Sequence, residues 1–141
     1  LNNKKKINEY LKIFSNQSNS SFLSLILIDA DDLKQINNIY SHSVGDMIIV
    51  HLADKIKRYS GVLNATAYRV DGGKFALLSF LNEKDLTKGL NDLKDSIKSH
   101  SIYTNKGNIN VSVCMGVGFY TKSKSIDILL KSANEAFIKI I

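Results

Sequence analysis

The sequence predicts an α/β sandwich, an α+β architecture in which a central, mainly antiparallel five-stranded sheet is flanked by helices. Three observations support this fold class. Residues Phe22 to Ile28 form a continuous apolar run, which is typical of a central strand buried on both faces. Gly72 and Gly73 separate two β-prone runs, which predicts a hairpin whose tight turn uses the positive φ angles open to glycine. Segments with apolar residues at helical spacing alternate with these strands.

Length and composition indicate one globular domain. The chain has 141 residues, of which 44% are apolar and 23% charged, enough to bury a core of its own. No apolar run approaches the ~20 residues that span a bilayer. The single Cys114 cannot form an internal disulfide, and we expect it to be a small, unreactive core residue in a cytoplasmic protein. The net charge of +6 is scattered along the chain, which favours solvated lysine faces over a nucleic-acid interface.

The first half of the chain predicts three helical segments around the central strand. The first covers about residues 3–14 and is followed by a polar loop over residues 15–21. A short helical turn is expected over residues 32–37. A longer helix begins near Ser43, carries His51 as an ordinary, partly buried histidine, and stops at Gly61. Its expected apolar positions are Met47, Ile48, Val50, Leu52, Ile56 and Tyr59.

The second half predicts the hairpin, two helices and two further strands. The hairpin joins residues 64–68 to residues 76–80, and a helix follows over residues 82–100 with Asn82 as its N-cap ahead of Asp85. A short strand at residues 102–104 precedes a turn at residues 105–108. An alternating strand over residues 109–119 and a last helix from about Ser125 complete the order.

Several polar residues follow the central strand directly. Asp29 ends the strand, and the turn at residues 32–34 opens a short helix whose backbone amides, together with Lys34, suit an anion. Structural roles are alternatives: Asp29 or Asp31 could cap the helix, and Asp46 could be a first-turn carboxylate favoured by the helix dipole.

These residues carry a resemblance to a known family. Asp29-Ala30-Asp31-Asp32-Leu33-Lys34-Gln35-Ile36-Asn37-Asn38, followed by Tyr40-Ser41-His42 and Gly45-Asp46, resembles the GGDEF domain family of diguanylate cyclases. The family pattern there is Asp-x-Asp-x-Phe-Lys-x-x-Asn-Asp and then Tyr-Gly-His-x-x-Gly-Asp. The resemblance implies a nucleotidyl-cyclase-like palm fold. It also implies a reaction in which two GTP molecules, held by facing subunits, become cyclic di-GMP with the help of two divalent ions such as Mg²⁺.

By resemblance, each of the polar positions acquires a role. Asp29 matches the first metal ligand, and Ala30 matches the residue that lends a carbonyl oxygen. Lys34 belongs to the phosphate end of the nucleotide site. Asn37 and Asp46 occupy the positions that read the guanine edge, and an amide and a carboxylate suit the donors and acceptors of that base.

The hairpin departs from the family pattern Arg-Tyr-Gly-Gly-Asp/Glu-Glu-Phe. With Arg69 and Phe75 aligned, Asp71 and Gly72 fall on the two glycines, Gly73 on the metal-binding acid, and Lys74 on the glutamate. The second metal carboxylate is therefore missing. If Gly72-Gly73 form the turn, the hairpin tip moves by one residue, and Asp71 either replaces the lost ligand or pairs with Lys74.

Other family positions are also altered. The family's phosphate-binding lysine of the last helix falls on Ile141, and its product-inhibition pair falls on Val62 and Ala65.

Three functions remain open from the sequence. The first is a degenerate, catalytically inactive GGDEF domain that serves bacterial cyclic di-GMP signalling as a regulatory, nucleotide-sensing or dimerisation module. It would bind guanine nucleotide weakly, with Mg²⁺ in doubt, and pair with a second copy or a neighbouring signalling domain. The alternatives are an active cyclase with a rearranged metal site and a purely structural interaction domain. Because the chain begins at Leu1, we expect residues 1–141 to be a single domain excised from a longer protein, with any membrane anchor elsewhere.

Overall fold

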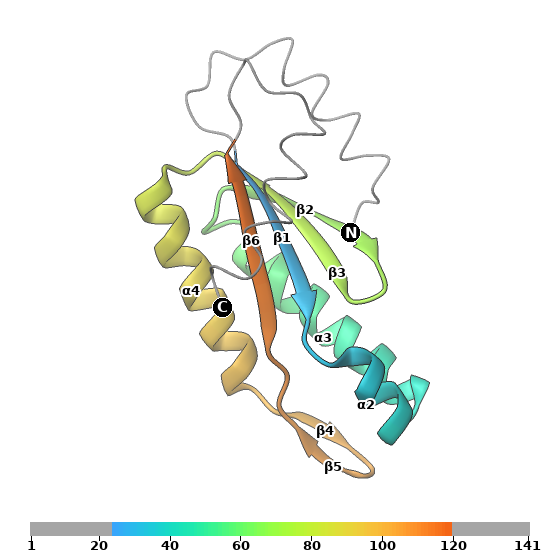
Figure 1. Ribbon diagram of the computed structural model, residues 1–141. Coiled ribbons are helices and arrows are strands. Elements are labelled where there is room, and N and C mark those ends of the chain that lie inside the picture. Colours follow the sequence, from blue (N-terminus) through green and yellow to red (C-terminus); the bar gives the residue numbers. More distant parts are fainter. Residues whose placement is uncertain (1–23, 120–141) are drawn as a thin grey trace.

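The computed structural model describes residues 24–119 (Figure 1). The elements in chain order are β1 (Ser24–Ala30), α2 (Leu33–Ile39), α3 (His42–Tyr59), β2 (Ala65–Asp71), β3 (Lys74–Ser79), α4 (Glu83–Ser99), β4 (Ile102–Thr104), β5 (Gly107–Ile109) and β6 (Val113–Phe119). The expected first helix, the following loop and the expected last helix lie outside these residues.

The main sheet has the strand order β2-β3-β1-β6, and every pairing in it is antiparallel. Residues 24–28 of the expected apolar run belong to the central strand, which begins at Ser24 among the described residues and extends to Ala30. The fold class and the mainly antiparallel sheet are therefore confirmed. Within the described residues, however, the main sheet has four strands where five were expected.

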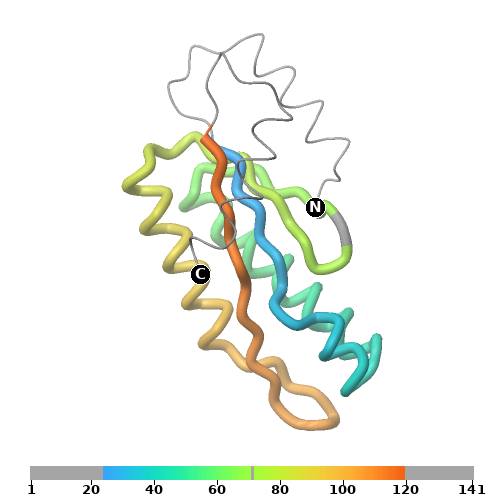
Figure 2. The backbone as a smooth tube through the Cα atoms, in the orientation of Figure 1, coloured from blue at the N-terminus to red at the C-terminus, as the bar shows by residue number. Residues whose placement is uncertain are grey.

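The difference in strand number arises at residues 102–109. Ile102 to Thr104 form a strand as expected, but it pairs with Gly107–Ile109 in a separate two-stranded sheet. The Thr104 hydroxyl donates to the Gly107 carbonyl at 2.6 Å, and the hydroxyl oxygen accepts from the Lys106 amide at 3.2 Å. Gly107 has a φ of 113°, which a residue with a side chain rarely adopts. This turn folds the chain back on itself before β6 begins (Figure 2).

The core lies between the sheet and the two long helices. Alternate residues of the sheet, including Ile26, Ile28, Phe75 and Met115, pack in one cluster with α3 and α4. The intervening residues of the sheet are buried too, among them Leu25, Leu27, Tyr68, Ala76 and Leu78. Burial of β1 on both faces explains why its sequence is continuously apolar rather than alternating.

The helices agree with the sequence in position but not in every buried residue. In α3 the buried residues are Val44, Gly45, Ile48, Leu52 and Ile56, which follow one helical stripe. Met47 and Val50, which the sequence placed in the apolar set, are 42% and 68% exposed. That part of the prediction is wrong, because these residues lie on a different side of the helix. Among the described helices, none is long and apolar enough to cross a membrane.

The start of α4 yields a stability prediction. The Asn82 side-chain oxygen accepts a hydrogen bond from the Asp85 amide at 2.9 Å, as expected for an N-cap. We expect Asn82→Ala to lower the free energy of unfolding by about 1 kcal/mol in urea denaturation, because a helix-end amide loses its acceptor. Asn91→Ala, at an exposed position within α4, is the matched control and should have little effect.

Candidate functional site

The site is built around the end of β1. Asp29 lies opposite Lys74 of β3 and opposite Cys114 of β6, and Lys74 in turn lies opposite Asp71 of β2. Directly paired residues of antiparallel strands lie on the same face of a sheet. The register therefore arranges these four positions in one row across the sheet, in the order Asp71, Lys74, Asp29 and Cys114.

Gly72 and Gly73 form the turn of the hairpin. In the strand register Asp71 lies opposite Lys74, and a bulge lies between Arg69 and Asp71. The bulge absorbs the one-residue displacement, so that Phe75 keeps its buried position while the hairpin tip moves.

Gly73 is closely surrounded at the end of β1. Its carbonyl accepts a hydrogen bond from the Ala30 amide at 3.0 Å. A Cβ atom added to Gly73 would lie 2.7 Å from Leu33 Cδ2 and 3.1 Å from the Ala30 Cβ, so a side chain there requires Leu33 to move. A Cβ on Gly72 would meet nothing within 4 Å.

Backbone conformation is not the reason for the hairpin glycines. Among the described glycines a positive φ occurs at Gly107, not at Gly72 or Gly73. The expectation that this turn uses positive φ is therefore wrong. What the glycine at residue 73 provides is room for the end of the Leu33 side chain.

Asp29 is half-buried, and opposing effects act on its carboxylate. Burial raises the pKa of Asp29 above its ordinary value, the Lys74 ammonium lowers it, and the charge of Asp31 raises it. Lys74 is thus a cation that acts directly on Asp29. In the family pattern this neighbourhood holds two acids and a metal ion.

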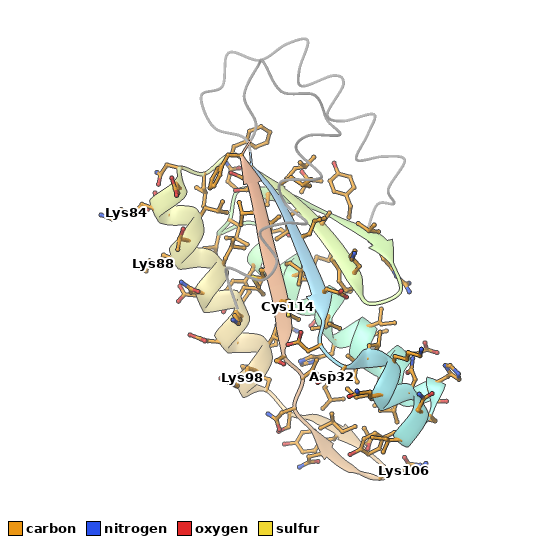
Figure 3. All side chains as sticks on the ribbon, viewed as in Figure 1. Asp32, Lys84, Lys88, Lys98, Lys106 and Cys114 are labelled. Carbon is orange, nitrogen blue, oxygen red and sulfur yellow. The ribbon has the colours of Figure 1, made fainter. Side chains whose placement is uncertain are left out.

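Asp31 is hydrogen-bonded to the segment at the start of β6. Its carboxylate accepts hydrogen bonds from the Ser112 hydroxyl at 2.6 Å and from the Cys114 thiol at 2.7 Å. Its amide also donates to the Ser112 carbonyl at 3.0 Å. Burial and this contact with Asp31 raise the pKa of Cys114 to about 11, so the thiol is protonated and unreactive near neutral pH. The expected unreactive role of Cys114, which is labelled on β6 in Figure 3, is supported.

The residues expected at the phosphate end of the site lie in the connection from β1 to α2 and in the first turn of α2. Asp32 is the residue before the helix, has a φ of 58°, and makes no side-chain cap. It lies where β1 ends (Figure 3). The alternative in which Asp29 or Asp31 caps the helix is not seen. Lys34 is exposed on the first turn of α2.

Gly45 lies next to both of the residues that are expected to read guanine, Asn37 in space and Asp46 in sequence. The Asn37 side chain packs against Gly45, where an added Cβ would overlap Asn37 Oδ1. This oxygen is buried and has no hydrogen-bond partner among the described residues. Asp46 follows Gly45 and is exposed on α3. A glycine early in a helix was the sequence signal for this close approach, and the sequence analysis did not use it.

The residues at the end of β1 do not fit a divalent metal ion. Among the side chains that the structure describes, which do not include that of Asp71, there is no group of three or more His, Cys, Asp or Glu that could hold one. Asp29 and the Ala30 carbonyl would be the donors, with a lysine opposite them and a glycine in the place of the second acid. The donor set is too small, and its electrostatic environment is adverse.

Comparisons with known proteins identify relatives of the chain. A family model described as diguanylate cyclase, GGDEF domain, matches residues 1–140. The diguanylate cyclase DgcZ of Escherichia coli is 26% identical over 115 residues, which cover 81% of this chain and 38% of that protein. Diguanylate cyclase A of Treponema denticola is 33% identical over 102 residues, covering 70% of this chain and 26% of that protein. An uncharacterized membrane protein of Staphylococcus saprophyticus is 30% identical over 107 residues, covering 74% of this chain and 30% of that protein. The chain thus spans well under half the length of these relatives.

Solved structures share the fold. The diguanylate cyclase SiaD of Pseudomonas aeruginosa, in complex with its activator SiaC, superposes with a TM-score of 0.89 at 20% identity. That match covers 98% of this chain and 54% of the SiaD chain. The GGDEF domain of DgcB from Caulobacter crescentus, in complex with c-di-GMP, gives a TM-score of 0.86 at 20% identity, covering 97% of this chain and 83% of that one.

The packing around Gly73 generates a prediction about stability. We expect Gly73→Asp to destabilise the domain by about 1–3 kcal/mol in urea denaturation, because Leu33 must move to admit the new side chain. Gly72→Asp is the matched control, since its new side chain enters open space. Equal effects of the two substitutions would show that space at residue 73 is not the constraint.

Proposed function

The chain belongs to the diguanylate cyclase GGDEF domain family, and we propose that this member does not cyclise GTP but acts as a regulatory module, which senses a nucleotide or mediates dimerisation. The observation that carries the proposal is the cross-strand pair of Asp29 and Lys74 beside Gly73. Where the family pattern requires a second carboxylate, this chain has a glycine closed in by Leu33 and Ala30. Where the family pattern has a further acid, this chain has the ammonium group of Lys74.

Electrostatics makes metal binding unfavourable in this arrangement. An ammonium about 6 Å from a divalent ion is repelled by roughly 5 kcal/mol at an effective dielectric of about 20. This is an upper limit, since Lys74 is partly exposed and could turn toward solvent. Even a fraction of that repulsion matters where Asp29 is the one matching carboxylate ligand. We therefore infer that the domain works without Mg²⁺.

An active cyclase with Asp71 as the replacement ligand is the alternative, and the strand order disfavours it. β3 lies between β2 and β1, so Asp71 is two strands away from Asp29, a backbone separation of about 10 Å. Lys74 lies between them in the row.

Retention of the guanine-reading positions supports nucleotide binding. Asn37 and Asp46 match the family pattern, and Asn37 Oδ1 is an acceptor without a partner among the described residues. Guanine presents N–H donors along its edge, which suits a carboxylate and an amide oxygen. Because the phosphate-binding lysine of the family is Ile141 here, we expect low affinity. On the same proposal the domain is cytoplasmic and regulates a partner, as a second copy or within a longer signalling protein.

Enzymatic turnover provides the first test. We expect the purified 141-residue chain to produce no cyclic di-GMP from GTP with Mg²⁺ or Mn²⁺, measured by chromatography, because the second metal carboxylate is missing at Gly73. Product above trace level would support the active-cyclase alternative instead. A calorimetric titration with GTP that shows neither binding nor turnover would support the purely structural alternative.

A repaired variant tests the proposed reason for the missing turnover, which is poor metal binding. Gly73→Asp combined with Lys74→Glu restores both acids and should increase Mn²⁺ affinity more than Gly73→Asp alone, which leaves the ammonium opposite Asp29. If the single and double variants bind Mn²⁺ equally, Lys74 is not the obstacle.

Asp46 provides the test of the guanine pocket. We expect Asp46→Ala to reduce GTP binding by about 1–3 kcal/mol in calorimetry, because it leaves guanine donors unpaired. Asp92→Ala, which removes an exposed carboxylate from α4, should leave binding unchanged. Equal binding of GTP by Asp46→Ala and the parent, or equal binding of ATP and GTP, would show that these residues do not read guanine.

A further inference from the structure

A groove lies on the side of α3 that faces β4, away from the Asp29–Lys74 pair. Its lining residues are Ser43, Asp46, Met47, Val50, His51 and Asp54 of α3 and Ile102 of β4. We call it the α3–β4 groove, and its volume is about 500 Å³. Surface pockets of a few hundred cubic ångströms and more are typical of binding sites.

The six α3 residues follow a regular helical spacing. Counted from Ser43 they stand at positions i, i+3, i+4, i+7, i+8 and i+11. They are distinct from the buried residues of the same helix, so α3 carries a core stripe and a second, outward stripe. The outward stripe is about 16 Å long at 1.5 Å per residue. A long, narrow site of this spacing matches the side-chain ridge of another helix.

His51 lines the groove with a neutral imidazole whose Nε2 atom is turned away from solvent. Its Nε2 is buried and has no hydrogen-bond partner among residues 24–119. Burial, with the nearby Lys55 and His100, lowers the pKa of His51, so the imidazole is neutral at pH 7. The neighbouring Lys55 is engaged elsewhere, with Ser96 Oγ at 3.2 Å and His100 Nδ1 at 3.0 Å.

Charge indicates the chemistry of the occupant. Asp46 and Asp54 are eight residues apart on α3, about 12 Å along the helix axis. The apolar Met47 and Val50 lie between them and are 42% and 68% exposed. Asp54 pairs with Arg58 at 3.1 Å, but both side chains are largely exposed, so this pair exchanges readily. On a chain with a net charge of +6, two carboxylates flanking an apolar centre favour a basic partner.

The wall opposite α3 is fixed in place. The Lys106 ammonium donates to the Tyr40 carbonyl at 2.8 Å, which ties the β4–β5 hairpin to the connection between α2 and α3. Lys106 lies at the tip of that hairpin in Figure 3. Ile102 is buried at the edge of the hairpin and provides the apolar side of the groove. The site is therefore largely formed before a partner arrives.

We propose that the α3–β4 groove docks a basic amphipathic helix of a partner protein. Apolar side chains of that helix pack on Met47 and Val50, and two Lys or Arg residues two turns apart reach Asp46 and Asp54. The proposal goes beyond the nucleotide function, because Val50, His51 and Asp54 belong to no nucleotide position. Asp46 is common to both proposed sites, so a docked helix and a bound guanine compete for its carboxylate.

The test uses NMR titration of the isotope-labelled chain with a synthetic helix. The probe is an alanine- and leucine-rich peptide of about 20 residues with two lysines about seven residues apart. The expected result is saturable shifts at the residues lining the groove, including the His51 imidazole signals. The same peptide with glutamates in place of lysines should bind at least about tenfold more weakly.

Variants of the chain provide matched controls. Val50→Glu and Asp54→Lys should each weaken binding of the lysine peptide about tenfold or more. Val62→Glu changes an equally exposed valine outside the groove, and Asp92→Lys reverses an exposed carboxylate on α4, so both should bind as the parent does. The proposal is overturned if neither peptide binds at millimolar concentration, if both bind equally, or if the groove variants behave like their controls. GTP calorimetry on Val50→Glu tests the nucleotide function separately, because Asn37 and Asp46 are unchanged.

Discussion

The pairing of β1 with β3 is the constraint on which the candidate site depends. Ile28 lies opposite Phe75 and Asp29 opposite Lys74, and Ile28 and Phe75 are fully buried. A one-residue slip would turn Phe75 out of the core and Lys74 into it, at a cost of several kcal/mol for the buried charge. The hydrophobic core thus determines that an ammonium group lies beside Asp29. The lysine cannot leave this row without a change in the packing of the whole sheet, although its flexible side chain can turn within it.

Two further features accompany the loss of the second carboxylate. Other side chains fill the space beside residue 73, and a neighbouring acid, Asp31, is taken up by hydrogen bonds. Leu33 and Ala30 occupy the volume into which a side chain at residue 73 would project. Asp31 accepts hydrogen bonds from Ser112, just before β6, and from Cys114 of β6, and is not available to a ligand without breaking two short hydrogen bonds. These features act together, since each makes metal binding less favourable by a different means: steric, coordinative or electrostatic. Restoring one acid therefore removes one of the three obstacles to metal binding and leaves the other two in place.

Features with a local sequence signal were predictable, and features that depend on distant residues were not. The buried central strand, the Asn82 cap and the hairpin turn at Gly72-Gly73 follow from short patterns, and the structure confirms them. The bonds from Asp31 to Ser112 and Cys114 join residues 81 and 83 positions apart, and no local pattern reveals them. Met47 and Val50 were misplaced because hydrophobicity alone does not say which side of α3 meets the sheet. The reason for Gly73 was also missed, because the neighbours that exclude a side chain come from β1 and α2.

Helix α3 joins the two proposed binding functions in one rigid element. Near its start Gly45 receives the Asn37 side chain, and the next residue, Asp46, already lines the α3–β4 groove. A partner helix that shifts or tilts α3 would therefore alter the contact between Gly45 and Asn37, and a nucleotide held there would in turn bias the position of α3. Such coupling is reciprocal by thermodynamic necessity, and it requires differential contacts at two sites rather than chemistry at either. On these two proposals, a cyclase fold that lacks its second metal carboxylate still offers what a regulatory module needs, which is two binding surfaces on one helix.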